Sequence, residues 1–123
     1  LGAIRSMVAA QVHGARRYIM LSSIGAEVNS TSRIAHYHKA KAHADNFLRE
    51  SGLDYSVVCP GVLRDDPGTS SVSVSLEPGS RGTTLRENLA EALALCLDLD
   101  STIGKTFSLL DGDTPIEAAL RSL

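Results

Sequence analysis

The sequence predicts an α/β domain built on a mostly parallel β-sheet, and three observations support this. Segments with helical spacing of apolar residues alternate with segments of strand character along the 123 residues. The strand-like segments are short, continuous apolar runs, which are typical of strands covered on both faces. Pro60 and Gly61 directly follow the second of these runs, and a proline cannot donate to the ladder of a central strand.

The first two elements are a helix and a buried strand. Apolar residues repeat at helical spacing up to Gly14, which suits the position just past a helix end; they are Ile4, Met7, Val8 and Val12. Residues 18–21 then form an apolar run that predicts a strand. We interpret Arg16 and Arg17 as a solvated pair before it. The strand is followed by Ser22 and Ser23.

A polar loop and a second helix come next. Residues 26–33 are polar and can provide a helix cap. The helix that follows runs to about Ser51 and ends at Gly52; its apolar stripe consists of Ala40, Ala44, Phe47 and Leu48. This helix carries Tyr37 and Lys41.

The second strand covers residues 55–59 and ends at Pro60 and Gly61. We expect a loop after it, at the same edge of the sheet as Ser23. Ligands of open parallel sheets bind beyond the carboxyl ends of the strands. The sequence therefore predicts that Ser23 and the segment 60–63 meet at one crevice.

The remaining residues predict one excursion, one more sheet strand and two helices. Residues 71–76 alternate with period two, as in an edge strand, within a Gly- and Pro-rich excursion on the substrate side. Thr84 and Glu87 form a capping-box pattern before one helix, and Thr114 with Glu117 repeats it before the last. Residues 106–110 form a strand between these helices.

Composition indicates an ordinary globular protein, with 43% hydrophobic residues, 21% charged residues and a net charge of -2. This charge offers no basic surface for nucleic acid. No apolar run approaches the roughly 18 residues that span a bilayer. Cys59 and Cys96 lie in apolar surroundings without metal or redox spacing, which favours reduced thiols and a cytoplasmic location.

Tyr37 and Lys41 have the spacing of a catalytic pair. Positions i and i+4 share one face of a helix, so the phenol and the ammonium can point into the same cleft. The cation would lower the pKa of the phenol and make it a usable general acid or base. Taken alone, this spacing also occurs by chance on a solvated helix face.

Three histidines lie near this pair; they are His36, His38 and His43. Their spacing does not place them on one face of a helix, and no carboxylate or cysteine completes a ligand set. We therefore expect no metal site there.

The sequence contains no Gly-rich turn between a strand and a helix that could hold a pyrophosphate, and it opens on Leu1. We therefore expect residues 1–123 to be the C-terminal part of a larger domain, inactive by itself. An incomplete sheet would expose the edge of strand 18–21 and allow self-association through it.

Three segments carry a resemblance to a known family; they are residues 14–23, 51–61 and 112–116. With them, the chain resembles the C-terminal half of atypical short-chain dehydrogenase/reductases of the NmrA-like, NAD(P)H-binding group, closest to a bacterial subgroup labelled sugar epimerases or flavin-reductase-like proteins. The resemblance implies part of a Rossmann-like, doubly wound parallel sheet. The chain departs from the family at Cys59, where arginine is common, and at Asn88, where aspartate is usual.

The resemblance also implies roles for individual residues. Ser23 would polarise a substrate carbonyl, Tyr37 would transfer the proton, and Lys41 would also bind the nicotinamide ribose. The nicotinamide pocket would be lined by Ser22, Pro60, Gly61, Val62 and Leu63. The implied cofactor is NAD(P), with NADP slightly favoured, and the implied partner is a small-molecule substrate. The implied activity is that of an NAD(P)-dependent oxidoreductase; a dinucleotide-sensing regulator and an NAD-dependent sugar epimerase remain alternatives.

Overall fold

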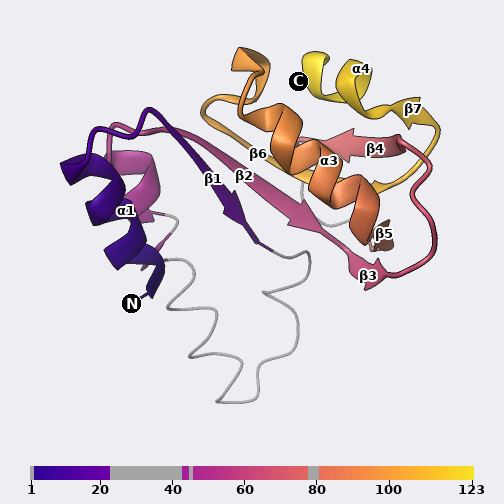
Figure 1. Ribbon diagram of the computed structural model, residues 1–123, viewed down its shortest axis with the longest axis horizontal. Helices are drawn as coiled ribbons and strands as arrows, with labels where there is room; N and C mark the ends of the chain where they lie inside the picture. The colour runs from indigo at the N-terminus through magenta and orange to yellow at the C-terminus, as the bar shows by residue number, and fades with distance from the viewer. Residues whose placement is uncertain (1, 23–42, 45, 78–80) are drawn as a thin grey trace.

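The computed structural model describes residues 2–22, 43–44, 46–77 and 81–123 (Figure 1). Several residues singled out above lie outside the described residues; they are Ser23, the polar loop 26–33, His36, Tyr37, His38, Ala40 and Lys41. The remaining candidate site residues, Ser22 and 60–63, lie within the described residues.

Five of the described strands form one mostly parallel sheet, as the sequence predicts. Its strands are β1 (Arg17–Leu21), β2 (Asp54–Pro60), β6 (Lys105–Asp111), β4 (Ser71–Ser75) and β7 (Thr114–Pro115), in that spatial order. The first three run parallel, while β4 is antiparallel to both β6 and β7. The carboxyl ends of β1, β2 and β6 therefore share one edge, which we call the carboxyl edge, and their starts share the amino edge.

A second, two-stranded sheet continues beyond the end of β2. Here β3 (Val62–Arg64) pairs in parallel with β5 (Thr83–Leu85). Figure 1 shows β3 following the arrowhead of β2 and lying beside β5. The expectation of a loop after Pro60 is therefore wrong for residues 62–64, because β5 supplies the hydrogen bonds of a strand.

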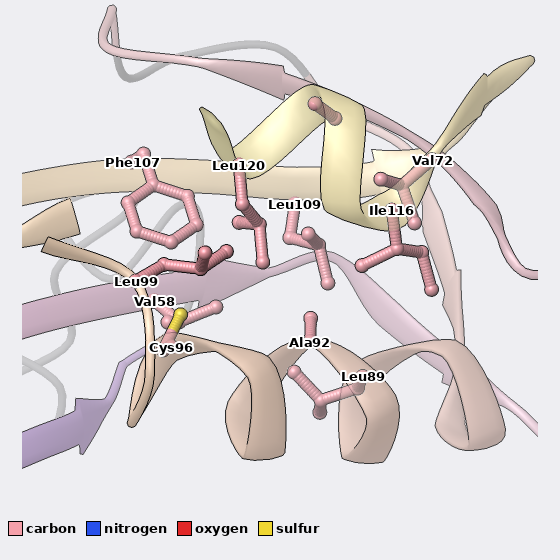
Figure 2. Packing of buried hydrophobic residues seen from close by; sticks show 11 residues of the cluster. Val58, Val72, Leu89, Ala92, Cys96, Leu99, Phe107, Leu109, Ile116 and Leu120 are labelled. Carbon is pink, nitrogen blue, oxygen red and sulfur yellow. The ribbon is translucent and has the colours of Figure 1, made fainter. Parts of the chain in front are cut away.

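Helices cover both faces of the main sheet. Helix α1 (Gly2–Val12) and the helical residues 43–44 and 46–50 pack on one face, and α3 (Arg86–Cys96) and α4 (Ile116–Arg121) pack on the other. Strand β2 shows the alternation, since Val57 joins the first cluster and Val58 the second. Figure 2 shows Val58 between the α3 residues and Phe107 of β6.

Glycines end the helices where the sequence predicts. Gly14, shortly after α1, and Gly52, shortly after the helical residues 46–50, have φ angles of 74° and 77°. This left-handed conformation costs glycine little and stops a helix. A third turn of this kind, at Gly104, follows the 3-10 helix η1 (Asp100–Thr102) and leads into β6.

Two local predictions are wrong. Neither α3 nor α4 has a side-chain hydrogen bond at its N-cap, and the N-cap residues are Leu85 and Pro115. The Thr84 hydroxyl faces β6 instead, because β5 extends to Leu85. Residues 71–75 do form a strand, in which Val72 is buried and Ser73 exposed, but β4 lies between β6 and β7 in the main sheet rather than at the edge of an excursion.

The interpretation of Arg17 as solvated is also wrong. Its guanidinium donates to the carbonyl oxygens of Asp54 and Cys96, both at 2.6 Å, and to the hydroxyls of Ser56 and Thr102, both at 3.0 Å. Arg17 thereby joins β1, β2, the end of α3 and η1 at the amino edge. Its neighbour Arg16 is exposed, as expected.

None of the described helices has the length and apolar character needed to cross a membrane.

Candidate functional site

The carboxyl edge brings together the described candidate residues. Leu21 pairs with Val58, and the Ser22 amide donates to the Val58 carbonyl at 2.8 Å, so the β1–β2 ladder extends to Ser22. Strand β2 continues to Pro60, which pairs with Leu109 of β6. Ser22 and Pro60 thus lie at the same edge, while Ser23, which the sequence predicts to meet residues 60–63 there, lies outside the described residues.

The backbone at Gly61, between β2 and β3, is held by close contacts and two hydrogen bonds. A Cβ atom at this position would overlap the Gly82 carbonyl and approach the Leu110 side chain, so only glycine fits without a shift. The Gly61 amide donates to the Thr84 hydroxyl at 2.9 Å, and the Val62 amide donates to the Gly82 carbonyl at 3.0 Å. The direction in which the chain leaves β2 is therefore set by Thr84 and Gly82.

Beyond this turn, consecutive side chains differ in their surroundings. Leu63 packs against the core under α3, whereas Val62 is 71% exposed. An exposed apolar side chain next to fixed backbone groups can contact one face of a planar ring.

Sequence reasoning missed Asp111, which closes this edge at the end of β6. Its carboxylate accepts hydrogen bonds from the Thr83 hydroxyl at 2.6 Å and from the Leu85 amide at 2.9 Å. The Arg64 Nε lies 3.7 Å from the same carboxylate. Because Leu85 directly precedes α3, Asp111 places a negative charge where the helix dipole favours one. No local pattern reveals this contact, since Asp111 lies 26 residues from Leu85.

Side chains of the first turn of α3 hold the loop 65–70 and the start of β4. Arg86 pairs with Asp65 at 2.7 Å, and the Glu87 carboxylate accepts from the Gly68 amide at 2.8 Å. The buried Asn88 accepts from the amides of residues 69 and 70 and donates to the Thr69 hydroxyl and the Ser71 carbonyl. Position 88, noted above only as a departure from the family pattern, therefore anchors the loop that follows β3.

The acidic pair in this loop is engaged by arginines. Asp66 lies 3.5 Å from Arg64, and Asp65 contacts Arg86. Within the part of the chain that the structure describes, no three His, Cys, Asp or Glu side chains gather as metal ligands would. The described site is thus built from backbone amides, apolar surface and paired charges.

Comparison with known proteins identifies the family of this chain. A family profile described as NAD(P)H-binding matches residues 2–100. The chain is 38% identical over 124 residues to a Bacillus subtilis protein named "Uncharacterized sugar epimerase YhfK", covering 99% of this chain and 58% of that protein.

Two solved structures are similar as well. A putative NAD-dependent epimerase/dehydratase from Bacillus halodurans superposes with a TM-score of 0.88 at 38% identity, over 99% of this chain and 58% of that one. The oxidoreductase ylbE from Lactococcus lactis gives a TM-score of 0.84 at 30% identity, with the same coverage of 99% and 58%. The chain therefore spans little more than half the length of these proteins.

Proposed function

Because the chain belongs to the NAD(P)H-binding family, we propose that it supplies the nicotinamide-binding and catalytic part of an NAD(P)-dependent oxidoreductase. The observation that carries the proposal is the fixed segment 60–63 at the carboxyl edge, next to the end of β1 that carries Ser22. Ligands of open parallel sheets bind at this edge. In this proposal the exposed Val62 contacts the nicotinamide ring, and Ser22 and Pro60 line the pocket beside it.

The proposed chemistry is reduction of a carbonyl or the reverse oxidation of an alcohol. Reduced nicotinamide supplies a hydride to the carbonyl carbon. Tyr37 gives its phenolic proton to the carbonyl oxygen, so an alcohol forms, and solvent returns a proton to the phenolate. Ser23 donates a hydrogen bond to the same oxygen, while Lys41 lowers the pKa of the phenol and binds the ribose.

The test is Tyr37→Phe in the full-length protein. We expect turnover with NADPH and a panel of carbonyl compounds to fall by about 10²-fold or more, the usual contribution of a general acid, with cofactor affinity retained. Lys41→Met should weaken both turnover and cofactor binding, because it removes the ribose contact as well. Unchanged turnover in Tyr37→Phe would exclude the catalytic role and favour a regulator that only senses dinucleotides.

A second candidate function is epimerisation, favoured by the names of two relatives, a sugar epimerase and an epimerase/dehydratase. An epimerase returns the hydride to its substrate, so the cofactor stays bound and is not consumed. In that case nicotinamide should copurify with the full-length protein and be released on denaturation. A cofactor-free preparation that oxidises added NADPH would exclude epimerisation.

We propose NADP as the preferred cofactor, which predicts a lower Kd for NADPH than for NADH in the full-length protein. Fluorescence titration with both reduced cofactors measures the ratio. An equal or higher Kd for NADPH would reverse the preference without affecting the proposed chemistry.

We further propose that residues 1–123 expressed alone bind no dinucleotide and self-associate through β1, which has one neighbouring strand among the described residues. An unpaired strand edge is a template for pairing with another chain. Sedimentation at several concentrations should show a concentration-dependent increase in mass. Replacing the edge residue Leu21 by lysine should reduce the increase, whereas Val12→Lys on α1 should not; both side chains are exposed.

A further inference from the structure

We propose that Thr84 is a positioning residue for the nicotinamide end of the cofactor, acting through the turn at Gly61. The inference rests on the function proposed above, in which residues 60–63 line the nicotinamide pocket. Thr84 touches neither cofactor nor substrate in this role. It fixes the backbone that does.

The Thr84 hydroxyl on β5 forms a bridge between Gly61, which links β2 to β3, and strand β6. It donates to the Leu109 carbonyl at 2.6 Å and accepts from the Gly61 amide at 2.9 Å. A hydroxyl has one proton to donate and lone pairs to accept, so one side chain can satisfy both groups at once. Pro60 pairs with Leu109 in the sheet. The Thr84 hydroxyl therefore links Gly61 to β6, the strand with which the preceding residue, Pro60, is paired.

The bridge is shielded from solvent. Thr84 and Leu109 are both 0% exposed. Losing a buried hydrogen bond is costly, and a side chain that cannot form the bridge removes a donor from the Leu109 carbonyl and the acceptor of the Gly61 amide. Water can reach the half-buried Gly61 more easily than Leu109. We therefore expect the turn at Gly61, rather than β6, to shift when the hydroxyl is removed.

A shift of this turn has consequences at the surface. The Val62 amide is held by the Gly82 carbonyl, and Gly82 lies on the segment leading into β5, which carries Thr84. Thus β5 and the residues just before it fix two successive amides, those of Gly61 and Val62. In the proposed complex, these two bonds hold the exposed Val62 side chain and its backbone in one position beside the nicotinamide ring. Losing one of these bonds weakens contacts with the nicotinamide and leaves the adenosine end of the cofactor unaffected.

The first measurement concerns the bond itself. In the wild-type protein, hydrogen exchange of the Gly61 amide should be slow, although this amide belongs to no ladder of the main sheet. Thr84→Val, which keeps the shape of the side chain without its hydroxyl, should speed this exchange by about tenfold, as expected for one lost hydrogen bond. Thr84→Ser should restore protection.

The matched control is Thr102→Val at the amino edge, where an equally buried threonine hydroxyl is removed. It should lower the melting temperature without changing exchange at Gly61. Fast exchange at Gly61 in the wild-type protein, or equal exchange in Thr84→Val and the wild type, would overturn the inference. The wild-type measurement stands even if Thr84→Val does not fold.

The second measurement concerns the cofactor. In the full-length protein, Thr84→Val should weaken binding of the reduced cofactor by about tenfold, equivalent to one neutral hydrogen bond. Binding of ADP-ribose, or of its 2′-phosphate if NADP is the cofactor, should stay unchanged because these compounds lack nicotinamide. Thr84→Ser should recover the affinity.

The outcomes separate the two proposals. A wild-type protein that binds neither reduced cofactor contradicts the proposed function, while protection at Gly61 still reports on the bridge. Equal loss of affinity for the reduced cofactor and for ADP-ribose would overturn the positioning role, as would loss in Thr102→Val of the same size as in Thr84→Val.

Discussion

The amino and carboxyl edges of the sheet both depend on a fully buried threonine, but the two hydroxyls have different partners. At the amino edge, Thr102 accepts from a cation, Arg17, and from Ser56, and it donates to the Leu99 carbonyl. At the carboxyl edge, the Thr84 hydroxyl bonds to the Gly61 amide and the Leu109 carbonyl. The Thr102 hydroxyl thus belongs to a network centred on the Arg17 cation, whereas the Thr84 hydroxyl forms two neutral bonds that are separate from the contacts of the charged Asp111.

The same contrast applies to the side chains that hold each edge together. Arg17 and Asn88 each take part in four hydrogen bonds, but Arg17 joins four elements, whereas Asn88 holds the three successive residues 69–71, where the loop enters β4. The amino edge therefore contributes to the stability of the whole fold. The carboxyl edge keeps individual surface segments in place, which is what a binding site requires.

Arg17→Met should have the largest effect on stability. The substitution keeps much of the aliphatic volume but leaves the buried Ser56 and Thr102 hydroxyls and the Cys96 carbonyl with fewer partners. We expect the free energy of unfolding to fall by about 2–4 kcal/mol, the cost of several lost bonds to a charged group. Urea unfolding measures the change.

The control for this variant is Arg16→Met, which removes the same charge from an exposed neighbour and should change stability by less than about 0.5 kcal/mol. Equal effects of the two substitutions would show that the network at the amino edge contributes no more than a surface charge.

Asn88→Ala should have a smaller and more local effect. The amides of residues 69 and 70 lie in an exposed loop and can bond to water instead, so we expect a loss of about 1–2 kcal/mol. The loop 65–70 should also become sensitive to proteases in the folded protein. Urea unfolding and limited proteolysis measure the two effects, with Glu91→Ala on the exposed face of α3 as the control.

Asn88→Asp sharpens this prediction, because aspartate has nearly the same shape as asparagine but carries no amide donor. A carboxylate keeps the two acceptor bonds to the amides of residues 69 and 70 and loses the donor bonds to Thr69 and Ser71. Its effect should lie between those of the wild type and Asn88→Ala. A loss larger than that of Asn88→Ala would mean that repulsion at the Ser71 carbonyl outweighs the retained bonds.

The sequence predicted features that depend on local patterns and missed those that depend on contacts between distant residues. Strands β1, β2, β4 and β6 and the glycine helix ends were predictable because the strand patterns and a left-handed glycine are local signals, whereas the short strands β3, β5 and β7 were missed. Thr84 and Glu87 matched a local capping pattern, but the hydroxyl bonds to Leu109, 25 residues away. Arg17 seemed solvated because its partners come from segments 37 to 85 residues distant. The position of the carboxyl edge followed from the strands, whereas the contacts that fix its segments did not.

The smallest predicted effect is a dependence of stability on alkaline pH through Cys96 at the amino edge. Burial raises the pKa of the Cys96 thiol above its ordinary value of 9.0, and Thr102 and Arg17 act in the opposite direction. Because the pKa is higher in the folded chain, the unfolded chain loses this proton first. The stabilising contribution is therefore fully present below about pH 9 and is lost as the pH rises through the folded-state pKa.

The slope that one such group contributes is at most about 1.4 kcal/mol per pH unit. Other groups also titrate in this range, so the informative quantity is the difference between wild type and Cys96→Ala in urea unfolding at pH 8 and pH 10. We expect the wild type to lose more stability than Cys96→Ala over this interval. A smaller loss in the wild type would mean that Arg17 and Thr102 outweigh burial, and that the charge at the amino edge stabilises a thiolate as well as the fold.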